Sequence, residues 1–297
     1  MNVLTAQTTG RATVQTVGRR LGHWVSMLLL LVASLATLLP ATGAMASGGV
    51  AIPKQNWSFA GMFGTFDNAA LKRGAQVAVQ SCMTCHSIKY IKFDQLRQFG
   101  VSEQEVKTWA ESQGRTKKDA MLSGMEAAAA KEAFGVVPPD LSLITKARKG
   151  YEDYVFGILT GYASAADVAL AQRVMADGKV SGEEAKEVAS QLQLDLRHPD
   201  KMGEVLKRIV AGENFNRYFP GHFFAMPAPL SDGAVVYSDG TENSRNQLAR
   251  DVVTFLAWAA EPTQMERKSL GIKVLLYLFV LTIMLYAVKR RIWAKVH

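Results

Sequence analysis

The sequence is poor in cysteine, with only Cys82 and Cys85 among its 297 residues. So few thiols exclude the dense disulfide framework that stabilises many small exported domains. A disulfide between these two would close a small, strained ring, because only two residues separate them. The function of the two thiols therefore has to be inferred from the residues around them.

Acidic side chains are absent from both ends of the chain. Residues 1–46 contain three arginines and residues 270–297 contain five lysines and arginines, so the net charge of +8 belongs to the ends. The intervening residues 47–269 hold 26 basic and 26 acidic side chains. This neutral region gives no support for a nucleic-acid-binding surface, and we predict no nucleic-acid partner. Because 48% of all residues are hydrophobic, a folded core is expected.

The N-terminal segment has the pattern of an export signal. Its arginines precede an apolar run at 24–39, and a cleavage pattern of small residues ends at Ala46. These features predict a signal peptide over 1–46, with Ser47 as the first residue of the mature chain. An uncleaved anchor helix is the alternative.

The C-terminal segment predicts a membrane span over 270–288. Its only charged residue is Lys273, which lies near one end, where a lysine can reach the lipid headgroups. A helix of this length measures roughly 28 Å at about 1.5 Å per residue, close to the hydrocarbon thickness of a bilayer. The basic tail 289–297 predicts a cytoplasmic C-terminus, which places 47–269 in the periplasm, outside a bacterial inner membrane. A buried core helix is the alternative.

The two cysteines lie in the pentapeptide Cys82-Met83-Thr84-Cys85-His86, the CxxCH pattern that attaches c-type heme. Thiols one helical turn apart can both reach the vinyl groups of one porphyrin, and the adjacent histidine then binds the iron. We therefore predict one covalently attached heme c, with His86 as an axial ligand. A thioredoxin-like redox pair is the alternative, but it requires a βαβ context that is not evident.

The second axial ligand of the iron is best sought in an apolar loop at 219–230. Met226 lies in this loop, whose prolines exclude a helix and fix the backbone near the sulfur. His222 in the same loop competes with it, and His198 is a weaker candidate. A position left open would instead favour a heme sensor or a peroxidase-like enzyme, because open iron binds small molecules whereas iron with two ligands transfers electrons.

The spacing of apolar residues predicts a mainly α fold. One helix at 68–80 leads into the heme cysteines, and Gly74 in it allows the close approach of a neighbour. A second helix at 246–260 follows a capping box formed by Ser244 and Gln247. Two such helices that cross beside a heme are the usual arrangement in small c-type cytochromes.

Further helical segments are predicted between these two, at 102–112, at the alanine-rich 124–134 and at 165–210. A rigid turn at 138–142 should start another helix. Within 165–210 we expect two helices, with Ser181 capping the second.

Taken together, these residues resemble the cytochrome c1 family, whose members are the heme subunit of the quinol:cytochrome c oxidoreductase (cytochrome bc1) complex. The resemblance extends over most of residues 50–295, and its blocks run in the family's order. Besides the heme pentapeptide, the blocks are Arg73-Gly74, Val137-Pro138-Pro139-Asp140-Leu141-Ser142, Lys146-Ala147-Arg148, Leu159-Thr160-Gly161-Tyr162, Asn216, Tyr218-Phe219-Pro220-Gly221, Ala225-Met226-Pro227 and Trp258-Ala259-Ala260-Glu261-Pro262.

The resemblance implies a c-type cytochrome domain in which Met226 is the second ligand of the iron. By the same resemblance, Pro138 and Pro139 would pack against the heme, while Arg148 and Tyr154 would contact a heme propionate. The fork of donors on an arginine suits a buried propionate, which needs a charge-assisted partner.

The resemblance also implies a one-electron relay that needs no catalytic residue in this chain. The heme would receive an electron from a Rieske iron–sulfur subunit and give it to a periplasmic cytochrome c. The single membrane span would pack beside cytochrome b, in a dimeric complex. A membrane-tethered carrier outside such a complex is the alternative.

Two segments depart from the family pattern. Residues 163–212 form an insert that is longer than in mitochondrial relatives, and we expect it to be a peripheral module remote from the iron. Residues 111–125, where many relatives carry an acidic stretch that docks basic cytochrome c, are not acidic, so the charge of the acceptor is left open. The predicted arrangement is a signal peptide (1–46), a periplasmic heme domain (47–269), a transmembrane helix (270–288) and a cytoplasmic tail (289–297).

Overall fold

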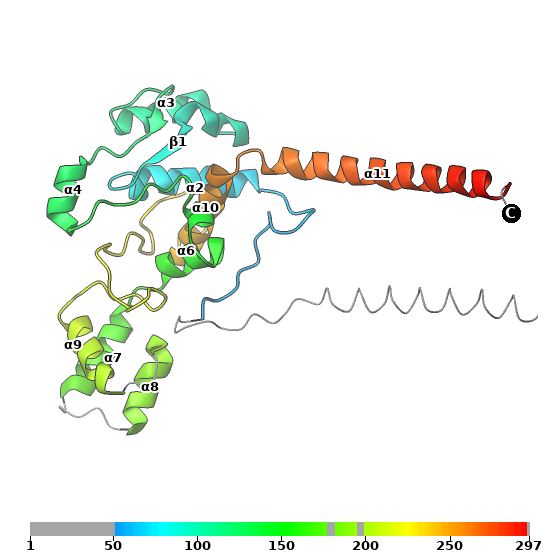
Figure 1. Ribbon diagram of the computed structural model, residues 1–297. Helices are drawn as coiled ribbons and strands as arrows, with labels where there is room; N and C mark the ends of the chain where they lie inside the picture. The colour runs from blue at the N-terminus through cyan, green and yellow to red at the C-terminus, as the bar shows by residue number, and fades with distance from the viewer. Residues whose placement is uncertain (1–50, 177–181, 195–198, 296–297) are drawn as a thin grey trace, which may run out of the picture. The chain divides into compact units, whose positions relative to one another are not determined.

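The computed structural model describes residues 51–176, 182–194 and 199–295, which are mainly helical, as predicted (Figure 1). The predicted signal peptide, the helix cap at Ser181 and the candidate ligand His198 lie outside the described residues. Among the described residues, buried apolar side chains form a larger and a smaller core. The larger core includes Cys82, the first of the two predicted heme cysteines, and the smaller core lies mostly in the insert.

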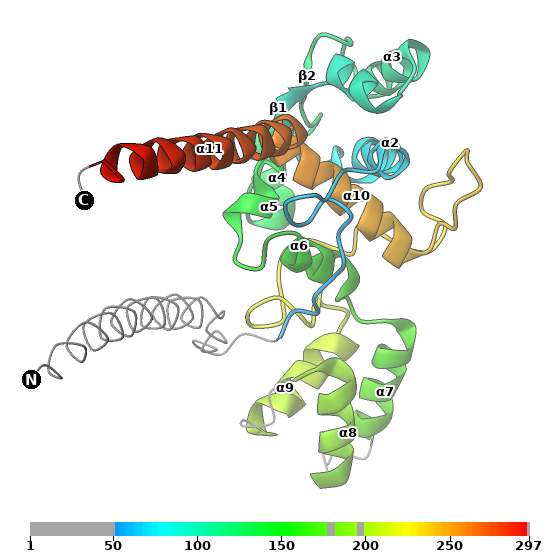
Figure 2. The ribbon, with the colours of Figure 1, turned by 90° about the vertical axis from the view of Figure 1, so that its right-hand side faces the viewer.

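Helices α2 (Asn68–Val77) and α10 (Arg245–Ala260) pack against each other in the larger core, as Figures 1 and 2 show. Gly74 permits this contact, because a Cβ at this position would lie 2.0 Å from the carbonyl oxygen of Asp251. The Arg73 guanidinium donates from Nε and Nη2 to the Asp251 carboxylate, at 2.9 and 3.1 Å. Asp251 is only 1% exposed, so this bidentate pair ties the two helices together inside the core. Both predicted helices are confirmed, and they pack against each other.

Replacing Gly74 with alanine is expected to destabilise the domain by about 1–3 kcal/mol, the usual cost of forcing extra volume into a packed interior. The higher helix propensity of alanine, worth about 1 kcal/mol, offsets part of this cost, but the clash is with backbone atoms of Asp251, which places the cost at the upper end of the range. Denaturant unfolding followed by circular dichroism measures the change. Gly203→Ala in α9 (Pro199–Val210) is a matched control, because a Cβ there meets nothing within 4 Å. Equal free energies of unfolding for the two variants would contradict this account of the contact.

Helix α2 continues into a π-helical turn, η1 (Ala78–Cys82), which ends at the first cysteine of the heme motif. The N–H of Met83 donates to the carbonyl of Ala78 at 2.9 Å and closes the wide turn. The helix predicted at 68–80 is therefore confirmed and extends two residues farther. Single π turns inside helices are frequent at functional sites.

A small antiparallel sheet follows the heme motif. Strand β1 (Ile88–Lys92) pairs with β2 (Ala120–Met121), with Ile88 opposite Met121. A 3-10 helix, η2 (Phe93–Phe99), follows β1 directly. The sheet closes one side of the larger core, because Ile88 and Met121 are fully buried.

One described α-helix lies between the two strands, and three lie between the sheet and the insert. Helix α3 (Glu103–Ser112) begins where it is predicted, with Ser102 as its N-cap. Helix α4 (Ala127–Phe134) begins three residues later than predicted, and the short α5 (Ile144–Ala147) follows the predicted rigid turn. Helix α6 (Tyr151–Thr160) packs on α5 and α10.

The described residues of the insert form three helices, so the prediction of two is wrong. They are α7 (Ala165–Ala176), α8 (Gly182–Leu192) and α9, which gather around the smaller core (Figure 2). The third helix has Pro199 as its first residue, the helical position at which proline is most favourable. The smaller core also includes Phe215, which lies beyond the insert.

The predicted capping box at the start of α10 is wrong. Ser244 occupies the N-cap position, but its side chain makes no capping hydrogen bond. The Gln247 amide instead donates to the Asp251 carboxylate at 3.1 Å. The Asp232 carboxylate accepts from the N–H of Arg245 at 2.7 Å. Asp232, an acidic residue of the preceding loop, thus accepts from a free N–H group at the start of the helix. The spacing of Ser244 and Gln247 does not predict this hydrogen bond.

Helix α11 (Gln264–Trp293) is the long C-terminal helix. Of the helices that the structure describes, it is the one long and apolar enough to span a membrane, and none of its residues is buried inside the protein. The predicted apolar helix is confirmed, and the alternative of a buried core helix is wrong. The helix extends past 270–288 at both ends, because the flanking charged residues are helical as well.

Candidate functional site

The candidate site begins at the turn that carries the two cysteines. The N–H groups of Cys85 and His86 donate to the carbonyl of Cys82, at 3.1 and 2.9 Å. This geometry puts the thiols one helical turn apart, and both cysteines are free. Burial raises the pKa of Cys82 to about 12, with a smaller contribution from Cys85, so its thiol is neutral.

A short hydrogen bond orients the ring of His86. Its Nδ1 lies 2.7 Å from the carbonyl oxygen of Pro139. Because a carbonyl can only accept, Nδ1 carries the proton and Nε2 is the nitrogen left for a metal. Burial lowers the pKa of His86, opposed by this hydrogen bond and by the charge of Asp140. The neutral imidazole that results is the form that binds iron.

The turn at 138–142 is bound to the chain that follows His86. The N–H of Leu141 donates to the carbonyl of Ser87 at 2.8 Å. The hydroxyl of Ser142 accepts from the N–H of Tyr90 at 3.1 Å. These bonds hold the carbonyl of Pro139 in place, and this carbonyl accepts the hydrogen bond from the ring of His86.

Apolar side chains on both sides of this turn remain exposed. Val136 and Val137 are 55% and 52% exposed, and Leu143 is 45% exposed. Pro138 is half-buried and Pro139 is exposed. Exposed apolar residues beside the turn that orients the imidazole are typical of a surface that an apolar ligand covers. A porphyrin with its iron fits this combination of apolar side chains, two thiols and a free imidazole nitrogen.

Met226 lies in an extended segment, and we call residues 214–230 the methionine loop. No helix occurs in it, as its prolines predict. The hydroxyl of Tyr162 lies 2.9 Å from the carbonyl oxygen of Met226 and 3.2 Å from that of Pro227. Tyr162 is only 4% exposed, and Phe224 stacks on it with ring centroids 5.6 Å apart. A buried tyrosine therefore fixes the backbone that carries the thioether.

Asn216 fixes the beginning of the methionine loop and is fully buried. Its Nδ2 donates to the carbonyl of Ile158 at 2.7 Å, and its Oδ1 accepts from the N–H of Tyr218 at 3.0 Å. Its backbone pairs with Tyr162 in an isolated β-bridge. No role was predicted from the sequence for Asn216 or Tyr162. The available signal was their presence in segments that resemble the family.

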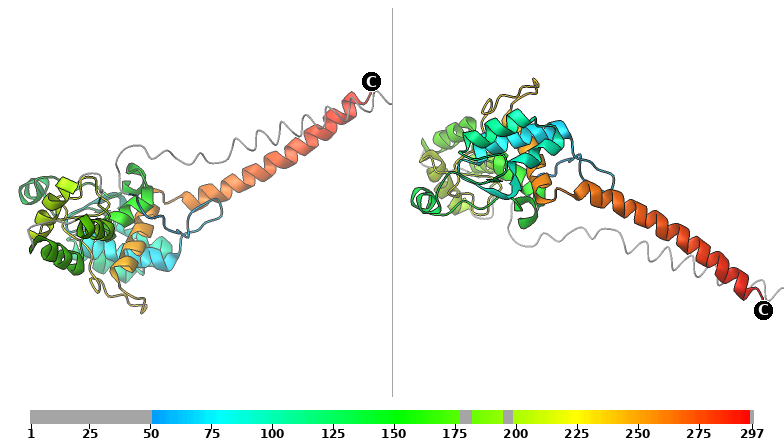
Figure 3. Two further views of the ribbon diagram at one scale, coloured as in Figure 1. Left: turned by 90° about the horizontal axis from the view of Figure 1, so that it is seen from below. Right: turned by 90° about the horizontal axis from the view of Figure 1, so that it is seen from above.

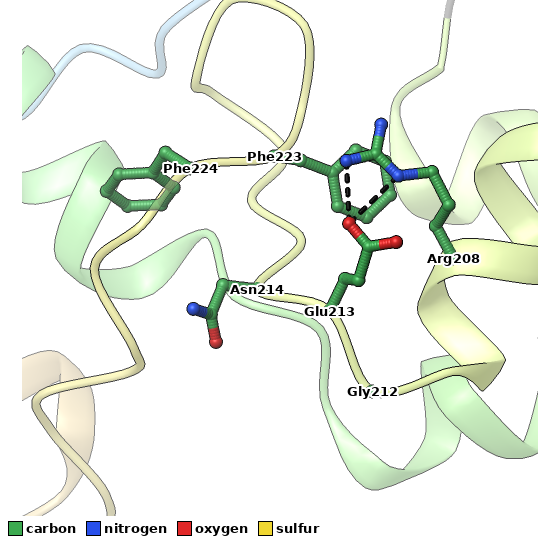
Figure 4. Close-up of a pocket in the computed structure, with 6 residues that line it drawn as sticks. All are labelled: Arg208, Gly212, Glu213, Asn214, Phe223 and Phe224. Atoms are coloured by element: carbon green, nitrogen blue, oxygen red, sulfur yellow. Dashed lines mark hydrogen bonds and ion pairs between the residues drawn. The ribbon is translucent and has the colours of Figure 1, made fainter. Parts of the chain in front are cut away.

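His222, the competing ligand candidate, packs toward the smaller core. Its ring stacks on Phe215 with centroids 5.5 Å apart. Figure 4 shows that the neighbouring Phe223 and Phe224 point away from each other. The guanidinium carbon of Arg208 lies over the Phe223 ring, 3.7 Å from the centroid of that ring. The methionine loop thus has one face toward the insert, where His222 lies, and another toward Tyr162.

The insert, predicted to be a peripheral module remote from the iron, contacts the methionine loop on the face that carries Phe223. Besides stacking on Phe223, Arg208 of α9 donates to Glu213 at 2.7 Å, beside a shallow pocket (Figure 4). Arg217 forms an ion pair with Asp167 of α7. Apolar and charged contacts therefore couple the insert to the loop that carries the predicted iron ligand.

The two residues expected to contact a propionate lie near each other. Arg148 follows α5, and Tyr154 lies in α6. Burial raises the pKa of Tyr154, and the nearby charge of Arg148 opposes this shift. The guanidinium is exposed, and its Nη1 donates to the carbonyl of Ala147 at 3.1 Å. Because Arg148 is exposed, a carboxylate ligand could reach the other donors of its guanidinium.

Comparison with known proteins decides the family. Residues 57–296 match the family model described as the Cytochrome C1 family. The relative named "Cytochrome c1" from Rhodospirillum rubrum is 40% identical over 266 residues, which cover 84% of this chain and 90% of the relative. The chain belongs to the cytochrome c1 family.

Two further members of the cytochrome c1 family have more informative names. The "Cytochrome b-c1 complex catalytic subunit, mitochondrial" of Candida albicans is 35% identical over 270 residues, 84% of this chain and 80% of the relative. The "Cytochrome b/c1" of Bradyrhizobium diazoefficiens is 33% identical over 299 residues, 90% of this chain but only 40% of that longer relative. Membership in the cytochrome c1 family makes this chain a heme-containing, membrane-anchored electron-transfer protein, so the predicted family and cofactor class are confirmed.

Proposed function

We propose that this member of the cytochrome c1 family is the heme subunit of a quinol:cytochrome c oxidoreductase. It would carry one heme c, bound covalently through Cys82 and Cys85, with His86 and Met226 as the axial ligands. The observation that carries this proposal is the 2.7 Å contact from Nδ1 of His86 to the carbonyl of Pro139. This contact leaves the opposite ring nitrogen for the iron, next to the two free thiols.

The chain would hold the heme and set its potential, while the bound heme supplies one-electron oxidation and reduction. Pro138 and Pro139 would pack against the porphyrin, and Arg148 and Tyr154 would bind a propionate. Tyr162 supports the thioether side through its bond to the carbonyl of Met226. Ligation by histidine and methionine raises the heme potential, which suits an acceptor of electrons from a high-potential donor.

We infer that the chain associates with cytochrome b in a dimeric complex, takes electrons from a Rieske iron–sulfur subunit and passes them to a periplasmic cytochrome c. The printed names of two relatives support the association with cytochrome b, since one is a subunit of a cytochrome b-c1 complex and the other is named for both cytochromes. The Rieske donor fits because such centres reach potentials of about +300 mV, and a heme ligated by histidine and methionine has a raised potential.

Purification in mild detergent tests this function. We expect b-type heme and an iron–sulfur subunit to co-elute with the tagged chain, and the fraction to reduce cytochrome c with quinol. Elution of the c-type heme without b-type heme would contradict the proposal and favour a membrane-tethered carrier. Rapid binding of carbon monoxide by the reduced protein would also contradict it and favour a heme sensor or a peroxidase-like enzyme.

We also propose that 47–269 is a periplasmic domain and that 289–297 is a cytoplasmic tail, because basic residues follow the apolar helix directly. A reporter enzyme that works only in the periplasm is expected to be active when fused after Glu266. The same reporter fused after His297 should be silent. The reverse pattern of activities would overturn the orientation.

A further inference from the structure

The segment before α2 contains a tightly closed turn, which we call the 57–66 loop. The N–H of Thr65 donates to the carbonyl of Ser58 at 2.9 Å and closes the loop. A Cβ at Gly64 would lie 1.9 Å from the carbonyl oxygen of Ala60, so the two sides of the loop are in close backbone contact. This closure fixes the position of the residues at its tip.

Phe59 anchors the base of the 57–66 loop in the protein, whereas the tip of the loop is exposed. Phe59 is 5% exposed and stacks on Phe66 with ring centroids 4.7 Å apart. At the tip, Met62 is 55% exposed and Phe63 is 80% exposed. Because the base is anchored and the turn is closed, the tip cannot fold back onto the core without breaking these contacts.

Lys268 ties the 57–66 loop to the first turns of α11. Its Nζ donates to the carbonyls of Phe59 and Gly64, at 2.7 and 3.0 Å. Figures 1 and 3 show the loop beside the beginning of this helix. Lys268 precedes Leu270, the first residue of the apolar run, by two positions, or about 3 Å along a helix axis. The loop therefore lies at the level where α11 enters the membrane.

We propose that Met62 and Phe63 insert into the interfacial layer of the lipid bilayer and form a second membrane contact beside α11. Apolar side chains such as phenylalanine bind at the boundary between headgroups and acyl chains, while the polar backbone stays hydrated. Helix α11 already holds the chain at the membrane. Insertion of the 57–66 loop into the lipid is therefore an intramolecular step.

This second contact would restrict the orientation of the heme domain. A single helix fixes the height of a domain above the membrane but leaves the domain free to tilt about the helix entry point. A rigid loop bonded to that entry point and seated in lipid removes part of this freedom. The effect needs no partner protein, since the loop, the lysine and the helix belong to one chain.

Photo-crosslinking in native membranes tests the proposal on the full holoprotein. Phe63→p-benzoylphenylalanine places a photoreactive group at the tip, and Met62→p-benzoylphenylalanine provides a second, independent position. After illumination we expect the chain to gain the mass of one phospholipid from either position. An unchanged heme spectrum before illumination shows that the variants are folded.

Val236 supplies the matched control, because it is also an apolar residue with high exposure, at 74%. It lies in the loop before α10, and its carbonyl accepts from Gln76 of α2 at 3.0 Å, away from Lys268. Val236→p-benzoylphenylalanine should give no lipid adduct. A protein adduct from Phe63 and Met62, absence of any adduct from both, or equal lipid adducts from Val236 would each overturn the proposal.

Discussion

In a Met226→Leu variant, the midpoint potential of the heme is expected to fall by at least about 60 mV, which is tenfold in the equilibrium of a one-electron couple. The thioether raises the potential of a histidine-ligated heme, and leucine offers no ligand in its place. Covalent attachment should persist because both cysteines remain. Redox titration of the purified complex measures the shift, and quinol oxidation should slow with it.

Met202→Leu is the control for this experiment. Met202 is a methionine of α9 that is 3% exposed and belongs to the smaller core, so leucine replaces it with nearly the same volume. Its variant should keep the potential of the parent protein. An unchanged potential in Met226→Leu itself would exclude Met226 as a ligand of the iron.

Replacing Cys82 and Cys85 together with serine is expected to abolish covalent heme attachment. The thiols form the thioether bonds, and a serine hydroxyl does not form them under the same conditions. Heme staining of denaturing gels measures the loss, because denaturation releases every heme that is not covalently bound. Each single cysteine variant should give weaker heme staining than the parent protein.

The Met226→Leu variant serves as the control on the same gel, since it should keep its stain while its potential falls. Full covalent retention of heme in the double cysteine variant would contradict the assignment of the two thiols. The two experiments thus separate attachment from axial ligation.

Features that depend on residues near one another in the sequence were predictable. The helix that leads to the cysteines, the helix predicted at 102–112 and the long apolar helix follow from local spacing, and the structure contains all three. The capping box at α10 shows the limit of this reasoning. There, the spacing of Ser244 and Gln247 was suitable, but Asp251 binds the glutamine instead.

The supports of the candidate site were not predictable, because they join distant segments. Tyr162 reaches the carbonyl of Met226 across 64 positions, and the ring of His86 reaches Pro139 across 53. The contact between Lys268 and Phe59 spans 209 positions. The periodicity of apolar residues along the sequence does not predict such pairs, because only folding brings these distant residues together.

With the heme bound as proposed, the smaller core would affect how the protein loses activity on heating. Separate hydrophobic clusters can unfold as separate cooperative units. Phe215 is buried in the smaller core, and Phe223 packs against it, so melting of the insert would release the methionine loop from one of its two supports. The heme would remain covalently bound to the two cysteines that follow α2, while the iron would lose the thioether of Met226. Heat would thus convert an electron carrier into a heme that is open to small molecules before the protein as a whole unfolds.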